Sequence, residues 1–303
     1  RKKPNVVIIL LESWSASQID CLRVARGVDP NGATPFFSSL AKKGRLYTRF
    51  FAAGQRSIYG IGAILAGVPT LPGTPFIGVG LGLSELGYIG HLAKNEGYNT
   101  YFLQGSPRMS FKCDAISSMS GFDEYFGAQD LPRSEDADRR HTLGVWDLDL
   151  FTKADQVFAA SEKPFLGFIF TLSTHRPSDV PNKDFMKYPA DKHGMYLNTL
   201  TYADWVMKGF FERVKENGYL DNTVFLITGD HTFFRNEKEG DITDRFRVPM
   251  LIVAPGLQPK LDDTIGTHAD VIPTVMDLAG WPGRHASAGR SLLEREHPER
   301  RFA

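Results

Sequence analysis

The sequence predicts an α/β fold in which helices cover both faces of a mostly parallel central sheet. Largely apolar runs, typical of buried parallel strands, occur at residues 5–11, 100–105, 164–172, 223–228 and 249–253. Segments with helical spacing or helix-capping residues separate them, so strand and helix alternate about five times. The chain has 303 residues and is 42% hydrophobic, which suffices for one domain spanning residues 1–303.

The composition excludes several classes of protein. Lys plus Arg and Asp plus Glu both number 35, so there is no basic excess for binding nucleic acid. The two cysteines, Cys21 and Cys113, are too few for a disulfide framework or a Cys-rich metal site, and they permit either redox compartment. The sequence shows no signal-peptide pattern and no run of about 18 apolar residues that would span a membrane. Because Arg1–Pro4 leads directly into a strand, we expect an ectodomain whose anchor or leader lies outside these residues.

The first strand, residues 5–11, is followed at once by Glu12. In an open α/β sheet the carboxyl ends of parallel strands form one rim, and ligands bind there. Glu12 is therefore expected on the same rim as the polar residues that follow the other strands. The alternative is that Glu12 is a solvated loop residue.

Three helices are predicted between the first and second of these strands, and the first two begin at residues of interest. Residues 35–43 predict a packing helix with Thr34 as its N-cap, and residues 58–66 predict a largely apolar helix with Ser57 at its N-terminus. Ser57 is either an N-cap or a nucleophile. In the second case the helix dipole and a nearby metal would both favour its alkoxide. Arg56 would steady a phosphate oxygen, or it would remain solvated.

Further helices are predicted at residues 84–95, 148–160, 198–217 and 270–278, with a polar loop at 106–114 and aperiodic chain at 121–146. His141, in the aperiodic stretch, is expected at the surface. Tyr202 and Trp205 are expected in the core. His175 follows the strand at residues 164–172 and is expected at the rim, where a lone His is usually structural but here joins other polar strand ends.

The strand at residues 223–228 ends in Gly229, Asp230 and His231. An Asp and a His side by side at this rim are well placed to hold a divalent metal through oxygen and nitrogen. The alternative is an Asp that caps the next turn beside a solvated His. The polar residues at the other strand ends favour the metal site.

Taken in order, these residues resemble the alkaline phosphatase superfamily, and within it the sulfatase-like branch of lipoteichoic acid synthases and bacterial phosphoglycerol transferases. The resemblance covers nearly the whole chain, from Asn5 to Leu293. It rests on short motifs at residues 5–13, 34–36, 54–57, 174–175, 229–231, 248–249 and 270–274. Each motif is weak alone, but their order and spacing together are specific. The resemblance implies an alkaline-phosphatase-like three-layer sandwich.

The resemblance also implies one divalent metal ion, Mn2+ or Mg2+ with Ca2+ or Zn2+ as alternatives, held by four side chains: Glu12, Ser57, Asp230 and His231. Ser57 would be the nucleophile with Arg56 beside it, and His175 would contact the substrate phosphoryl group or the leaving oxygen. A hard, oxygen-rich site with one His suits such a cation. The cation would orient the Ser57 hydroxyl and offset charge on the transferring phosphoryl group.

The sequence departs from this branch at several positions. The lipoteichoic acid synthases use Thr as nucleophile, whereas Ser57 keeps only the hydroxyl. Their glycerol-phosphate pocket has an Arg and a Trp that align with Cys113 and Phe111 here. Phe111 is therefore predicted to bind substrate, with Arg108 or Lys112 in place of the missing Arg. Sulfatases that form formylglycine need x-Pro-x-Arg after the nucleophile, and the residues after Ser57 lack it.

We therefore predict a metal-dependent phosphotransferase or phosphodiesterase that acts on a phospholipid or anionic glycan through a phospho-serine intermediate. One alternative is a sulfatase, or a phosphate or phosphonate monoester hydrolase, on the same scaffold. Another is a non-catalytic lipid- or glycan-binding ectodomain. No nucleic-acid partner is expected. The expected location is extracytoplasmic, periplasmic or at the cell surface, near a membrane reached through a segment outside these residues.

Overall fold

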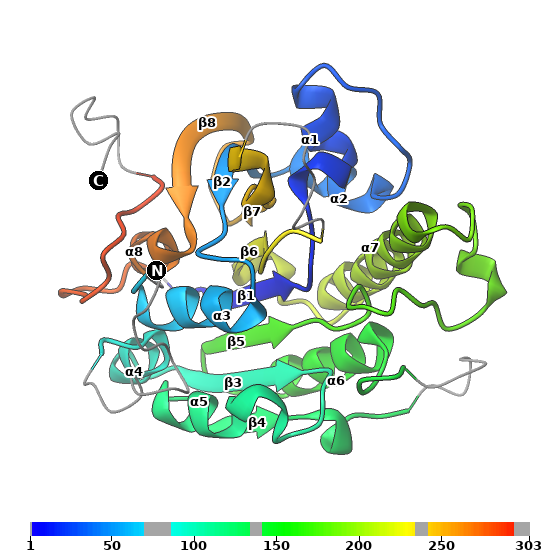
Figure 1. The fold of residues 1–303 in the computed structure, drawn as a ribbon. Helices are drawn as coiled ribbons and strands as arrows, with labels where there is room; N and C mark the ends of the chain where they lie inside the picture. Colours follow the sequence, from blue (N-terminus) through cyan, green and yellow to red (C-terminus); the bar gives the residue numbers. More distant parts are fainter. Residues whose placement is uncertain (1, 70–85, 134–140, 234–241, 294–303) are drawn as a thin grey trace.

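The computed structural model describes residues 2–69, 86–133, 141–233 and 242–293. Within these residues eight strands form one sheet, in the spatial order β4-β3-β5-β1-β6-β7-β2-β8 (Figure 1). The strands are β1 (Asn5–Leu11), β2 (Arg45–Phe51), β3 (Asn99–Gln104), β4 (Glu124–Phe126), β5 (Phe165–Phe170), β6 (Thr223–Gly229), β7 (Met250–Val253) and β8 (Lys260–Thr267).

Every pairing in this sheet is parallel except the two made by β7, which runs antiparallel to β6 and β2. The expectation of a parallel strand at residues 249–253 is therefore wrong in direction. An apolar run indicates that both faces of a strand are buried, but it carries no information about direction. The mostly parallel α/β sheet is confirmed, and the carboxyl ends of β3, β5, β1 and β6 share one rim.

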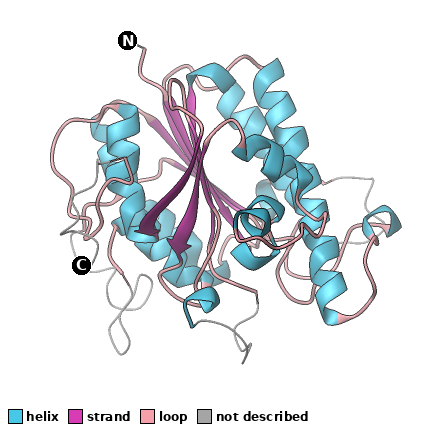
Figure 2. Ribbon diagram, turned by 90° about the horizontal axis from the view of Figure 1, so that it is seen from above, coloured by secondary structure: helices cyan, strands magenta, loops and turns pink. Residues whose placement is uncertain are grey.

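Helices cover both faces of the sheet, and Figure 2 shows the strands between them. Side chains alternate along β1, so Val7 and Ile9 pack on the side of α2, α6 and α7, whereas Val6 and Ile8 pack on the side of α3, α4 and α8. The helices are α1 (Asp20–Ala25), α2 (Pro35–Ala41), α3 (Ser57–Ala66), α4 (Ile89–Asn95), α5 (Cys113–Met119), α6 (Asp147–Ala159), α7 (Lys192–Glu216) and α8 (Val271–Ala279).

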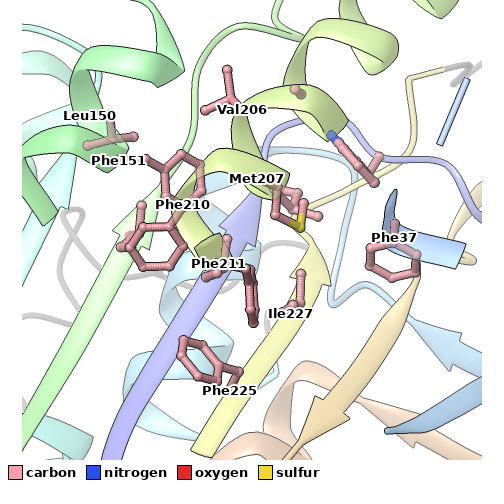
Figure 3. Packing of buried hydrophobic residues seen from close by; sticks show 14 of the residues in the cluster. Phe37, Leu150, Phe151, Val206, Met207, Phe210, Phe211, Phe225 and Ile227 are labelled. Carbon is pink, nitrogen blue, oxygen red and sulfur yellow. The ribbon is translucent and has the colours of Figure 1, made fainter. Parts of the chain in front are cut away.

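The core under α7 is rich in aromatic side chains (Figure 3). Phe211 of α7 packs on Phe225 of β6 with ring centroids 4.7 Å apart, and Phe210 packs on Phe151 of α6 at 4.9 Å. Burying one such side chain contributes on the order of 2–3 kcal/mol. Closely packed aromatic side chains therefore support β6 below its carboxyl end.

Several element boundaries differ from those predicted. β2, β4 and β8 were not predicted because charged or polar residues interrupt their alternation. α7 begins at Lys192, before residue 198, and α4 begins only at Ile89. The predicted start of that helix at residue 84 lies outside the described residues. The segment 106–114 is not all loop, because a 3-10 turn and the start of α5 occupy its second half.

One side-chain prediction in the helical layer is wrong, and another is confirmed in position but not in its hydrogen bond. Trp205 is 50% exposed, whereas Tyr202 is buried as expected. Thr34 occupies the N-cap position of α2, but its Oγ1 accepts from the Asp20 backbone N–H at 2.9 Å. Asp204 of α7 caps α2 instead, by accepting from the N–H groups of Phe36 and Phe37, both at 2.8 Å. α7 therefore fixes α2 as well as covering the sheet.

The structure also describes the state of the two cysteines and whether any helix could cross a membrane. Cys21 and Cys113 are both free thiols, so they do not pair with each other. Among the described residues, no helix combines the length and the apolar composition that crossing a bilayer requires.

Candidate metal and nucleophile site

Three segments far apart in the sequence meet at the carboxyl rim of the sheet. Glu12 follows β1, Asp230 and His231 follow the neighbouring strand β6, and Ser57 opens α3. One ligand atom from each of Glu12, Asp230 and His231 lies within 4.8 Å of the other two. Ser57 Oγ lies 3.2 Å from Glu12 Oε2 and 3.4 Å from His231 Nε2. The fold thus brings together the four side chains that the resemblance implied as metal ligands.

The Asp230 carboxylate has two oxygens in different surroundings. Oδ1 accepts hydrogen bonds from the backbone N–H groups of Ser13, at 2.7 Å, and His231, at 2.6 Å. Oδ2 is buried and receives no hydrogen bond within the described part of the chain. An unsatisfied buried carboxylate oxygen is costly unless a cation lies beside it. One oxygen is therefore fixed by the main chain, and the other is left for a ligand.

His231 is oriented by its other ring nitrogen. Its Nδ1 lies 3.0 Å from the Thr232 carbonyl oxygen, a bond that needs the proton on Nδ1. The lone pair of Nε2 then faces Asp230 Oδ2 at 3.4 Å and Glu12 Oε1 at 3.7 Å. A backbone carbonyl that fixes the tautomer in this way is typical of metal-binding histidines.

Glu12 is held at the rim by its neighbours. Its backbone N–H donates to Thr171 Oγ1 at 2.9 Å, and its carbonyl accepts from the Thr174 hydroxyl, both after β5. Ser13 has a left-handed φ of 56°, its hydroxyl donates to Glu12 Oε1 at 2.5 Å, and its carbonyl accepts from the Tyr196 hydroxyl at 2.7 Å. Such backbone strain in a non-glycine residue persists where surrounding bonds impose it, commonly at functional sites. Sequence reasoning missed these positioning residues, and hydroxyl residues after β5 were their only signal.

α3 is brought to the end of β6 through a close approach at Gly60. A Cβ there would lie 2.9 Å from the Asp230 carbonyl oxygen and 3.2 Å from the His268 ring. His268 Nε2 donates to the Gly229 carbonyl at 2.8 Å, and its Nδ1 accepts from the Ala53 N–H at 3.2 Å. Burial lowers the pKa of His268 to about 4, which keeps the ring neutral as these two bonds require. The loop before α3 is thereby tied to β6.

Apart from His231, the two buried carboxylates have no basic partner in the part of the chain that the structure describes. Among the described residues, no Lys or Arg forms an ion pair with Glu12 or Asp230. Burial and the charge of Asp230 raise the pKa of Glu12 to about 7, and burial raises the pKa of Asp230 to about 6. A divalent cation would offset both charges. Two carboxylates, one imidazole and one hydroxyl fit Mn2+ or Mg2+, and also Zn2+.

His175 and Arg56 flank this cluster. His175 is partly exposed after β5, and its Nδ1 lies 2.6 Å from the Arg176 carbonyl oxygen. It is close enough to Glu12 for its charge to lower the pKa of that carboxyl. Arg56 is the exposed N-cap residue of α3, directly before Ser57. Both residues lie where a group bound at Ser57 could meet them.

A family model described as Sulfatase matches residues 4–281. The chain belongs to the sulfatase family. A solved structure of a protein in the alkaline phosphatase superfamily from Vibrio parahaemolyticus is 29% identical, with a TM-score of 0.85 over 98% of this chain and 71% of that chain. The alkaline-phosphatase-like fold expected from the sequence is confirmed.

Relatives of this sulfatase-family chain include proteins named as a lipoteichoic acid synthase and as a phosphoglycerol transferase. Lipoteichoic acid synthase 1 of Bacillus subtilis is 27% identical over 98% of this chain and 49% of its own length. Phosphoglycerol transferase I of Citrobacter koseri is 26% identical over 68% of this chain and 29% of its own length. The lipoteichoic acid synthase LtaP of Listeria monocytogenes shares the fold, with a TM-score of 0.81 and 21% identity over 94% of this chain and 74% of that chain. The chain spans about half the length of the synthases it matches.

The three residues predicted to bind substrate follow β3 in the sulfatase-family fold. Arg108 is exposed, and its guanidinium forms an ion pair with Asp130. Phe111 is 54% exposed, and Phe111 and Lys112 have left-handed φ angles of 56° and 58°. Cys113 is fully buried in the core and cannot face a ligand. Arg108, Phe111 and Lys112 are therefore exposed, whereas the residue aligned with the family Arg is not.

The expectation that His141 lies at the surface is wrong. Its side chain is 5% exposed, and its ring meets that of Trp146 edge-on, with centroids 4.8 Å apart. The stretch before α6 has no periodicity, so nothing in its sequence indicates burial. Trp146 covers one side of its ring, and Gly144 of the same loop lies against Gly105 and Leu172, contacts that only the tertiary structure shows.

Proposed function

We propose that this domain is a metal-dependent phosphotransferase or phosphodiesterase with Ser57 as its nucleophile. The observation that supports this most is the position of Ser57 Oγ, 3.2 Å from Glu12 Oε2 and 3.4 Å from His231 Nε2, at the first turn of α3. The positive end of the helix dipole favours an alkoxide there. The names of the relatives support phosphoglycerol transfer over sulfate-ester hydrolysis.

The cation, Mn2+ or Mg2+, would be held by Glu12, Ser57, Asp230 and His231. When bound, it would supply positive charge that lowers the pKa of the Ser57 hydroxyl and offsets charge on the phosphoryl group. The unsatisfied Asp230 Oδ2 and the fixed tautomer of His231 both support this assignment.

In the first half-reaction Ser57 Oγ bonds to phosphorus, and the bond from phosphorus to the leaving oxygen breaks. Ser57 gives its hydroxyl proton to solvent, and the leaving oxygen takes up one proton to depart as an alcohol. We assign this second proton to Nε2 of a doubly protonated His175, because its Nδ1 already donates to the Arg176 carbonyl. In the second half-reaction an alcohol or water attacks phosphorus and gives its proton back to His175 Nε2, while the bond to Ser57 breaks and the serine oxygen takes up a proton from solvent.

The proposed substrate is a phospholipid or anionic glycan phosphodiester met at the extracytoplasmic face, near a membrane reached through a segment outside these residues. Arg56 would contact a phosphoryl oxygen. Arg108, Phe111 and Lys112 would contact the group attached to phosphorus, since all three are exposed after β3.

The test compares Ser57→Ala with Ser57→Thr, because threonine keeps the hydroxyl. The measurement is diacylglycerol release from phosphatidylglycerol vesicles with Mn2+, together with mass spectrometry of the peptide containing residue 57. We expect the alanine variant to lose turnover and the phosphorylated peptide, and the threonine variant to keep both. Circular dichroism confirms that each variant is folded. Undiminished turnover by Ser57→Ala contradicts the proposal, whereas sulfate release with an aldehyde at residue 57 supports the sulfatase alternative.

A further inference from the structure

A cavity of about 660 Å³ lies between the first two helices and the edge of the sheet. Its lining comes from α1 and α2, from the start of β2, and from the start of the edge strand β8 (Figure 1). Sites for small ligands have volumes of about 300–1,000 Å³. The cavity is therefore large enough to hold a ligand of that size.

The lining is apolar from its mouth to its floor. Val24 of α1 and Leu261 of β8 are 58% and 57% exposed, whereas Leu46 of β2 is 3% exposed, so the first two lie at the mouth and Leu46 at the floor. The thiol of Cys21 is half-buried in the same lining, and burial raises its pKa to about 11. Such a surface favours a hydrocarbon chain, because the chain would leave water on binding.

Two polar side chains deeper in the lining already have hydrogen-bond partners. The carboxylate of Asp20 accepts from three backbone N–H groups of residues 31–34, at 2.8, 2.9 and 2.9 Å. The Ser38 hydroxyl accepts from the Cys21 N–H at 3.1 Å. Because these bonds hold both groups in place, the polar atoms that can meet a ligand are those of the two lysines in the lining.

These lysines, Lys42 and Lys260, give the mouth a positive charge. Lys42 is the exposed C-cap residue of α2, and within the described part of the chain it forms no ion pair. The ammonium of Lys260 lies 3.0 Å from Asp262 Oδ2, and Arg45 approaches the same oxygen at 3.8 Å. One carboxylate is thus shared by two cations, while Lys42 has none. This excess favours a ligand with an anionic end.

The mouth lies at the end of the sheet opposite to the metal ligands. Lys42 is three residues before β2, and Lys260 is the first residue of β8, whose parallel register with β2 sets it beside Arg45. Ser57, in contrast, follows the carboxyl end of β2. The seven residues of β2 separate its two ends by about 20 Å. A ligand in this cavity would therefore not occupy the place of a phosphoryl group at Ser57.

We propose that this cavity binds a fatty acid, with the acyl chain against α1, α2 and β8 and the carboxylate beside Lys42. The volume suits a small ligand with a single chain rather than a phospholipid with two. This site is separate from the proposed phosphodiester chemistry and does not depend on it.

The first test is calorimetry with octanoate, decanoate and dodecanoate. Each added methylene that enters the cavity should raise the affinity by up to about fourfold. Decyltrimethylammonium has the same chain length as decanoate but a cationic end, and it should bind at least about tenfold more weakly. Equal binding of the two decyl ligands, or an affinity that does not change with chain length, overturns the proposal.

The second test compares Lys42→Met with Lys43→Met. Lys43 is the next residue and is also exposed, but it does not line the cavity. We expect Lys42→Met to weaken decanoate binding about tenfold without weakening that of decyltrimethylammonium, and Lys43→Met to change either by less than twofold. Turnover of bis(p-nitrophenyl) phosphate should be the same in both variants and the wild type. Equal losses of decanoate binding in the two variants contradict the assignment of Lys42.

The cysteines place the ligand within the cavity. Cys113 is fully buried in the core, so a thiol reagent added to the folded protein at alkaline pH should reach Cys21 alone. Saturating decanoate should slow this reaction at least about fivefold, and an unprotected Cys21 overturns the proposal. Flotation with phosphatidylglycerol vesicles tests a membrane instead. Vesicle binding that needs Lys42, with no binding of decanoate, would show that this face contacts a bilayer and that the fatty-acid site is wrong.

Discussion

The two sides of the rim are built in different ways. The metal side, Glu12, Asp230 and His231, is at most 2% exposed, and each member is fixed by bonds to or from the main chain. The proposed substrate side, formed by Arg108, Phe111 and Lys112, is exposed on the turn between β3 and α5. The metal side comes from strands in register, whereas the substrate side depends on turns that can change without disturbing the sheet.

The two sides also differ in how closely their residues match those of the family. The metal side retains every side-chain type that the resemblance implies. On the substrate side the family Arg and Trp give way to Cys113 and Phe111, and Cys113 is buried. The proposed metal ligands are thus tied to the sheet, and the proposed headgroup contacts to the segment after β3.

The largest effect is expected from Asp230→Asn. Asparagine still accepts from the Ser13 and His231 N–H groups through its carbonyl, but it removes the charge on the unsatisfied oxygen. Because mutating an outer-shell partner alone typically costs 10–100-fold in metal affinity or activity, losing a direct ligand should cost more than about 100-fold. The measurements are the metal content of the protein, by mass spectrometry, and the rate of phosphatidylglycerol turnover.

Asp130→Asn is the matched control for that variant, since Asp130 pairs with Arg108 on the substrate side. It should leave metal content unchanged and alter turnover only a few-fold, as expected for an exposed pair. If the two variants lose metal equally, the metal does not depend on the rim residues and the comparison between the two sides fails.

The metal side could be predicted from the sequence, whereas much of the remaining structure could not. The strands that carry Glu12 and Asp230 are uninterrupted apolar runs, so both were predicted to within one residue, and the parallel-sheet rule placed their ends together. Residues 45–51 and 260–267 were missed because a strand beside or at a sheet edge tolerates charged residues on its open face. The burial of His141, and the hydrogen bonds by which His268 joins the loop before α3 to β6, depend on tertiary contacts. No local sequence pattern indicates such contacts.

Metal binding by Glu12 and Asp230 should depend on pH. The pKa values of Glu12, about 7, and Asp230, about 6, lie above the ordinary values of 4.5 and 3.8, so a cation must displace protons below neutral pH. Metal affinity should therefore fall by up to about tenfold per pH unit as the pH drops below 7, and more steeply below 6. Calorimetry from pH 5 to 8 tests this. A flat profile would contradict the raised pKa values.

The same shifts give the metal-free protein an opposite trend in stability. A carboxyl whose pKa is higher when folded binds more protons in the folded state, so its contribution to the free energy of unfolding is present below pH 4 and is lost as pH rises through 7. Without metal, the melting temperature should decline from pH 5 to 8, and less steeply in Asp230→Asn. Added Mn2+ should reverse the decline at pH 8, where both carboxyls are ionised.

The smallest effect is expected from Arg108→Ala, which tests the substrate side alone. Its ion pair with Asp130 is exposed, so the free energy of unfolding should change by less than about 1 kcal/mol. If Arg108 contacts the headgroup, KM for phosphatidylglycerol should rise several-fold while kcat stays within about twofold, because a remote contact of this kind binds the ground state and the transition state alike. Arg108→Lys, which keeps the charge but not the planar fork, should regain part of the loss. A large fall in the turnover rate itself, with KM unchanged, would mean instead that the loop after β3 takes part in the chemistry, and the separation between the two sides would be lost.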